Sequence, residues 1–252
     1  MSKSESNPTE TEYEFEPFEF VFLSRRDEIL KLVGLTDYAL RSTHGLERLT
    51  SVLKKPNDAV EQAREIEASA QAEVDAGLPL LHGAAAVLIW GALEAAFRDF
   101  LVRWFVSHPS CLTAPEFRNV RVRVGEYEGL DGEDRMRFLV DVFERELSAS
   151  LKPGAGRYTC MLKPLGIVPD ISDKIRRDLN ELAATRNVIV HRAGIADERF
   201  VDLCPWLGLK LGDTVAVDHS AFERFIGATS NYVIAIIESA RSIAQNNHLG
   251  TE

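Results

Sequence analysis

Arg186, Asn187 and His191 lie close together in the sequence, in the run Arg-Asn-Val-Ile-Val-His. Their types suit acid–base chemistry on an anionic group. An imidazole can take up and return a proton near neutral pH, so His191 suits proton transfer during a reaction. The guanidinium of Arg186 carries a fixed fork of donors that matches phosphate oxygens. Asn187 stands one helical turn before His191 and can orient its ring or the bound anion. We therefore take these three as candidate catalytic residues.

The segment before this run has the spacing of an amphipathic helix. Its apolar positions and Arg186 follow one another in steps of four, three, four and three, which keeps them on one helical face. That face consists of Ile175, Leu179, Leu182, Arg186 and Ile189. A permanently charged side chain therefore interrupts a face that would otherwise enter a core. The neighbouring face carries Asn180, Ala184, Asn187 and His191. Asp170 or Ser172 can cap the start of this helix, Asp173 adds negative charge there, and Gly194 suits its left-handed end.

The spacing from Arg to His is not specific by itself. With 21 Arg and 6 His among 252 residues, about half an occurrence is expected by chance, so a match gains weight only from its context. Arg103 and His108 have the same spacing. Around Arg186 and His191 there is an Asn directly after the Arg, three aliphatic residues before the His and a glycine shortly after it. Arg103 and His108 lack these features, and we therefore favour the later pair.

Glu94 interrupts a second apolar face. The segment from Leu80 to about Val106 is apolar on nearly all sides, which is typical of a helix inside a bundle. Glu94 shares one face of it with Val87, Trp90, Phe97, Leu101 and Trp104. A carboxylate in such a place costs several kcal/mol unless a cation or hydrogen-bond donors accompany it. We expect Glu94 to support the site by holding Arg186 in a buried ion pair.

The composition is that of an ordinary soluble globular chain, with 45% apolar and 27% charged residues. A net charge of −10 argues against a general nucleic-acid coating protein, although residues 1–20 alone carry half of it. The three cysteines are widely separated and have no histidine at zinc-ligand spacing. We therefore expect no metal, no cofactor and no disulfide framework. The start of the chain lacks the pattern of a secretory signal, so we expect a reducing, cytoplasmic setting.

We expect an all-α protein with one small β element. The predicted divisions are a disordered acidic tail over 1–16, an N-terminal helical extension over 17–77, a helical bundle over 78–245 and a C-terminal tail over 246–252. Short alternating runs around Gly208 and Gly212 predict a small β-hairpin before the last helix. The most apolar segment, Ala84 to Phe97, contains Glu94 and falls short of the roughly 20 apolar residues of a membrane span. We therefore expect no association with a membrane.

These residues resemble a known family. An Arg, a polar residue, three apolar residues and a His at a helix end match the Arg-x4-6-His signature of HEPN domains. The segment PLLHGAAAVLIWGALEAAFRDFL looks like the early core helix of such domains, and RNVIVHRAGIADERF looks like their motif helix and its exit. The resemblance covers roughly residues 78–245. It implies a HEPN-like antiparallel helical bundle.

Many HEPN domains are metal-independent ribonucleases, so the resemblance implies an endoribonuclease that leaves a 2′,3′-cyclic phosphate. RNA carries its own nucleophile, the 2′-hydroxyl, and such an enzyme needs only proton transfer and positive charge at the phosphate. Family members place two motif helices face to face in a homodimer, and they often act as toxins or antiviral effectors restrained by an antitoxin or regulatory protein. Candidate contacts to the RNA backbone are Arg118, Arg121, Arg123 and Arg192.

Two other interpretations fit the same residues. One is a non-catalytic helical dimerisation or interaction module, in which Arg186 and Glu94 form a structural pair that only stabilises the fold. The other is a nucleotide-binding or nucleotide-transferring partner of a companion enzyme, as some HEPN-type domains are. The sequence has no glycine-rich phosphate loop with its lysine that would support an ATPase.

Overall fold

The chain folds into helices that run along and across one long bundle. A computed structural model describes residues 10–147, 152 and 154–249. The longer helices are α1 (Glu10–Ser42), α3 (Asn57–Asp75), α4 (Pro79–Ser107), α6 (Gly132–Glu146), α8 (Asp173–Arg192) and α10 (His219–Leu249). The shorter ones are α2 (Leu46–Val52), α5 (Val124–Glu128), α7 (Ala155–Leu162) and α9 (Glu198–Leu203), with 3-10 turns η1 (Pro109–Thr113), η2 (Pro115–Asn119), η4 (Lys163–Leu165) and η5 (Pro205–Leu207). The expected all-α class is confirmed over this part of the chain.

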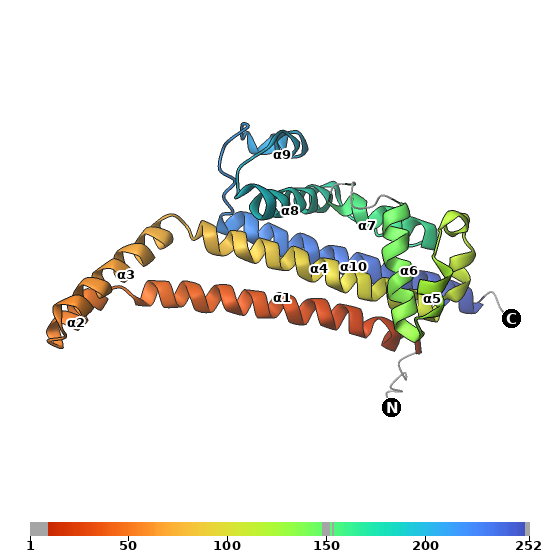
Figure 1. The fold of residues 1–252 in the computed structure, drawn as a ribbon, viewed down its shortest axis with the longest axis horizontal. Coiled ribbons are helices and arrows are strands. Elements are labelled where there is room, and N and C mark those ends of the chain that lie inside the picture. Colours follow the sequence, from red (N-terminus) through yellow and green to blue (C-terminus); the bar gives the residue numbers. More distant parts are fainter. Residues whose placement is uncertain (1–9, 148–151, 153, 250–252) are drawn as a thin grey trace, which may run out of the picture.

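Helix α4 is the centre of the bundle. It lies between α1 on one side and α8 on the other, with α10 beside it (Figure 1). Most of its apolar residues enter the core, and Leu93, Ala96 and Leu101 are fully buried, whereas Leu88 and Val106 are exposed. By length and composition α4 could also cross a membrane, but half of its most apolar window is buried inside the bundle. Core helices of soluble proteins commonly show this combination.

Helix α1, which begins the predicted N-terminal extension, packs into the same core as α4. Phe18 and Phe22 are buried, and the ring centroid of Phe18 lies 5.0 Å from that of Phe100 in α4. The helix begins at Glu10, so residues 10–16 of the predicted tail are helical, while residues 1–9 lie outside the described part. At the other end α10 continues to Leu249, past the predicted start of a C-terminal tail at 246. Burial of aromatic side chains stabilises α1 against α4 far more than local propensity does.

Helices α2 and α3 form an arm that projects from one end of the bundle (Figure 1). The carboxylate of Glu67 in α3 accepts hydrogen bonds from the backbone N–H groups of Gly45, at 2.7 Å, and Glu47, at 3.1 Å. These bonds satisfy donors at the start of α2 that have no partner within the helix. They also hold the pKa of Glu67 below its usual range.

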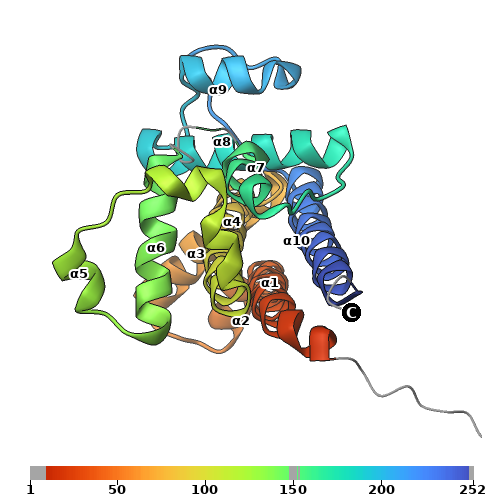
Figure 2. The ribbon, with the colours of Figure 1, turned by 90° about the vertical axis from the view of Figure 1, so that its right-hand side faces the viewer.

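The predicted β-hairpin is wrong. Residues 198–207 instead form α9 and η5, and the region has only one isolated β-bridge, between Ile195 and Thr214. The carboxylate of Asp197 caps α9 by accepting from the N–H of Phe200 at 2.9 Å, which favours a helix at a place where alternation suggested a strand. Viewed from the end, α9 lies outside α8, as a separate layer (Figure 2). A small second core of its own holds it there, formed by Ala184, Val188, Ala196, Phe200, Cys204 and Val215.

Candidate functional site

Helix α8 carries the three candidate catalytic residues, and its ends are those that the sequence predicts. The hydroxyl of Ser172 accepts from the N–H of Ile175 at 3.3 Å and caps the start. Leu179 and Leu182 are fully buried and anchor the helix on the core. At the far end Ala193 and Gly194 both take left-handed backbone conformations, with φ of 52° and 77°. Two such residues in succession turn the chain back toward α9.

Arg186 and His191 meet at the last turns of α8. Nη1 of Arg186 lies 3.4 Å from Nε2 of His191, so the guanidinium can donate to the neutral ring. Arg186 is half-buried and His191 is exposed. Among the described residues neither side chain forms an ion pair with a carboxylate. The guanidinium and the imidazole are therefore free to engage an anion that approaches the end of α8.

The expected pair between Glu94 and Arg186 is wrong. Glu94 binds Arg157 of α7, and the same guanidinium donates to Glu144 of α6 through Nε at 2.9 Å and Nη2 at 2.5 Å. Arg98 completes this cluster by donating to the second oxygen of Glu144 at 2.9 Å. Burial alone would raise the pKa of Glu144, but the hydrogen bonds from Arg98 and Arg157 outweigh it and hold that pKa below its usual range. Glu94, on the apolar face of α4, is therefore paired with a cation. That cation is Arg157 of α7 and not Arg186 of α8.

Arg157 was missed because Pro153, Gly154 and Gly156 gave its surroundings the composition of a loop. A signal for it was nevertheless present. Glu144 stands on the apolar side of α6, one turn after Val140, and its side chain is only 10% exposed. Two carboxylates on apolar faces, Glu94 and Glu144, require cations, and a single arginine can serve both.

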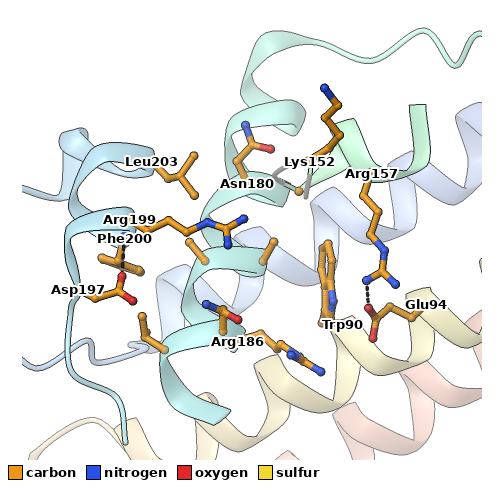
Figure 3. A pocket seen from close by; sticks show the side chains of 15 residues that line it. Trp90, Glu94, Lys152, Arg157, Asn180, Arg186, Asp197, Arg199, Phe200 and Leu203 are labelled. Atoms are coloured by element: carbon orange, nitrogen blue, oxygen red, sulfur yellow. Dashed lines mark hydrogen bonds and ion pairs between the residues drawn. The ribbon is translucent and has the colours of Figure 1, made fainter. Parts of the chain in front are cut away.

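Two neighbouring hollows surround the end of α8. The inner pocket has a volume of about 160 Å³ and lies between α4, α7, α8 and α9. Its polar and aromatic lining consists of Trp90, Glu94, Lys152, Arg157, Asn180, Arg186, Asn187, Asp197, Arg199 and Phe200, and Figure 3 shows most of these side chains. The outer hollow is wider, about 750 Å³, and is lined by His191, Arg192 and the loop to Gly212. Both hollows share Asn187, Asp197 and Arg199.

The inner pocket is cationic although the chain as a whole is acidic. Four cationic side chains line it, Lys152, Arg157, Arg186 and Arg199, against the two carboxylates of Glu94 and Asp197. Arg157 already compensates Glu94. In the described part of the chain no ion pair is found for Arg186 or Arg199. A local positive field on a chain with net charge −10 is the property expected of a site for an anionic ligand.

A second buried cluster fixes the outer wall of the site. Trp206 of η5 donates from Nε1 to Glu181 of α8 at 2.8 Å, and Arg224 of α10 donates to Glu181 at 2.7 Å and to Asp178 at 2.5 Å. Arg177 lies over the indole of Trp206, 4.4 Å from its centroid. Hydrogen bonds to Glu181 and Asp178 raise the pKa of Arg224. These contacts tie the segment after α9 to two helices of the bundle.

The remaining candidate residues are divided between different places. Arg192 lines the outer hollow beside His191. Arg121 and Arg123 line a different hollow, between α5 and α6, and Arg118 is exposed on η2. The structure therefore does not bring these three together with Arg186.

The second Arg-to-His pair of the sequence has a structural environment. Nε of Arg103 donates to Asp99 at 2.8 Å, and the ring of His108 stacks on Trp104 with centroids 4.1 Å apart. Arg103 thus has a carboxylate partner, which is not found for Arg186 among the described residues.

Within the described part of the chain, no group of three or more His, Cys, Asp or Glu side chains is placed to hold a metal ion. Comparisons with protein-family models, with curated proteins and with solved structures find no match for this chain.

Proposed function

We propose that this protein is a metal-independent endoribonuclease whose site is formed by Arg186, Asn187 and His191. The observation that carries the proposal is the pairing of Arg186 with His191 at 3.4 Å, without a carboxylate to neutralise the guanidinium among the described residues. Most guanidiniums near the core have such a partner, including those of Arg103, Arg157 and Arg224. A half-buried cation without one is expected where an anionic ligand supplies the missing charge.

In the proposed reaction the 2′-hydroxyl of RNA attacks the adjacent phosphorus. His191, as the neutral imidazole, takes the proton from that hydroxyl while the bond from phosphorus to O2′ forms. The bond from phosphorus to O5′ of the next nucleotide breaks, and O5′ takes up a proton from solvent water, while the proton on His191 is released to solvent afterwards. Arg186 stabilises the charge that builds on the phosphate oxygens, and Asn187 orients the phosphate or the ring. The products are a 2′,3′-cyclic phosphate and a free 5′-hydroxyl.

The rival interpretation required a structural pair between Arg186 and Glu94. Arg157 occupies that place, so Arg186 is not needed to neutralise the buried carboxylate. The homodimer, the antitoxin or regulatory partner, the role as a toxin or defence effector and the cytoplasmic setting stay predictions.

Cleavage of RNA in the presence of EDTA tests the proposal. The wild type is expected to cut and to leave cyclic phosphate ends, and His191→Ala and Arg186→Ala are each expected to lose activity by a factor of about 100 or more. Two matched controls are His44→Ala, whose side chain is 85% exposed on the projecting arm, and Arg103→Ala of the second Arg-to-His pair. Equal cutting by wild type and His191→Ala, with both folded, would overturn the proposal.

A further inference from the structure

The inner pocket reaches beyond the residues that the reaction needs. Arg199 extends from α9 toward the middle of the pocket, and Trp90 stands on the opposite side (Figure 3). Asn180 lies on α8 nearly two turns before Asn187, so two amides face the same hollow. Trp90 also packs in the core against Tyr158, with ring centroids 5.7 Å apart, but Arg199 and Asn180 have no part in proton transfer or in the charge of the reacting phosphate. They need a different explanation.

The size of the pocket limits what it can take. A volume of about 160 Å³ is close to that of a cavity of about 150 Å³ that holds benzene, so the pocket is large enough for a single aromatic ring. A nucleic-acid duplex cannot enter it. The amides of Asn180 and Asn187 offer both donors and acceptors, which the edge of a base requires, and the indole of Trp90 offers a flat apolar edge.

The positive charge of the pocket suits the phosphate group of a nucleotide. Arg186 and Arg199 come from different helices, and no carboxylate is paired with either in the described part of the chain. Guanidiniums of this kind bind phosphate through two parallel hydrogen bonds. Arg199 and Asn187 also line the outer hollow beside His191, so a ligand in the inner pocket continues directly to the proposed reaction centre.

We propose that the inner pocket is a subsite for one unpaired nucleotide of the RNA substrate, next to the bond that is cut. Arg199 contacts the phosphate of that nucleotide, and Asn180 with Asn187 reads the edge of its base. This inference rests on the proposed ribonuclease function, and it names the substrate class as single-stranded RNA. Unpaired bases can be turned out of a strand into such a pocket at low cost, whereas paired bases must first be unstacked.

The test measures binding without catalysis. Calorimetric titration of the His191→Ala protein uses three sets of probes: the four nucleoside 3′-monophosphates, the four nucleosides and inorganic phosphate. At least one monophosphate is expected to bind more tightly than both its nucleoside and inorganic phosphate. Adding Arg199→Gln is expected to weaken that binding by about tenfold, the usual effect of removing a charge-assisted hydrogen bond. Asn180→Ala is expected to reduce the preference between bases.

Arg48→Gln is the matched control, because Arg48 is an exposed arginine on the projecting arm. The inference is overturned if Arg199→Gln binds as the control does, or if inorganic phosphate binds as tightly as every nucleotide. Failure of the ribonuclease proposal gives a different result. Nucleotide binding that depends on Arg199, in a protein whose wild type cuts no RNA, removes the reaction and leaves a nucleotide-binding pocket.

Discussion

Replacing Arg157 with alanine removes the cation that two carboxylates share. Glu94 has 25% and Glu144 has 10% of its side chain exposed, so neither is well hydrated once Arg157 is gone. Breaking a fully buried pair costs about 3–5 kcal/mol. Glu144 keeps Arg98 as a partner, and Glu94 is partly exposed, so we expect Arg157→Ala to lower the free energy of unfolding by about 2–4 kcal/mol. For a chain of this size that is a fall in Tm of about 4–15 °C.

Urea unfolding of four proteins measures this effect: the wild type, Arg157→Ala, Arg186→Ala and Glu94→Gln. Arg186→Ala is expected to cost less than about 1 kcal/mol, because within residues 10–147, 152 and 154–249 no carboxylate is paired with its guanidinium and would be left without a cation. Double-mutant cycles with Glu94→Gln separate the two arginines further. A coupling energy is expected between Glu94 and Arg157 and none between Glu94 and Arg186. If Arg186→Ala destabilises as much as Arg157→Ala, or shows the coupling to Glu94, the assignment of the ion pairs is refuted.

Two further predictions concern a glycine and a histidine outside the reaction centre. Gly154→Ala is expected to destabilise by about 2 kcal/mol or more, because its φ is +46° and an added Cβ would lie 2.7 Å from Cα of Asn180. Gly156→Ala, inside α7, would meet its nearest atom at 3.6 Å and is expected to be neutral or slightly stabilising by thermal unfolding. Burial, and then the nearby His219, lower the pKa of His82 from its ordinary 6.5; the unfolded chain therefore binds the proton first, and stability falls as the pH drops below 6.5. Urea unfolding at several pH values should show that His82→Asn flattens this dependence, and an unchanged pH profile would contradict it.

Local chemistry was enough to predict the helix that carries the site. The cap at Ser172, the apolar steps through Leu179 and Leu182 and the left-handed end at Gly194 are each a property of a few neighbouring residues. The nearness of Arg186 to His191 follows from the same helix. These features could be read in the sequence because none of them depends on how helices pack.

Features that depend on packing could not be predicted in the same way. A charge on an apolar face needs a partner, and Glu94 showed that need, but the sequence does not say which cation from another helix reaches it. The apolar residues of α1 do not say which helix they pack against, so its contact with α4 could not be predicted. Alternation around Gly208 favoured strands, while the cap at Asp197 and the ring of Pro205 favour the short helices that are found.

The small core between α8 and α9 is separate from the main core, so the site lies between two packed clusters. One face of the inner pocket belongs to the main bundle, and the other belongs to a segment held by Ala193 and Gly194 at one end and by the bond from Trp206 to Glu181 near the other. Such a segment can open locally at a free energy well below that of global unfolding. A ligand bound between α9 and the bundle would therefore protect α9 from local opening more than it protects the bundle. The binding free energy would be reduced by the free energy needed to close the segment that contains α9.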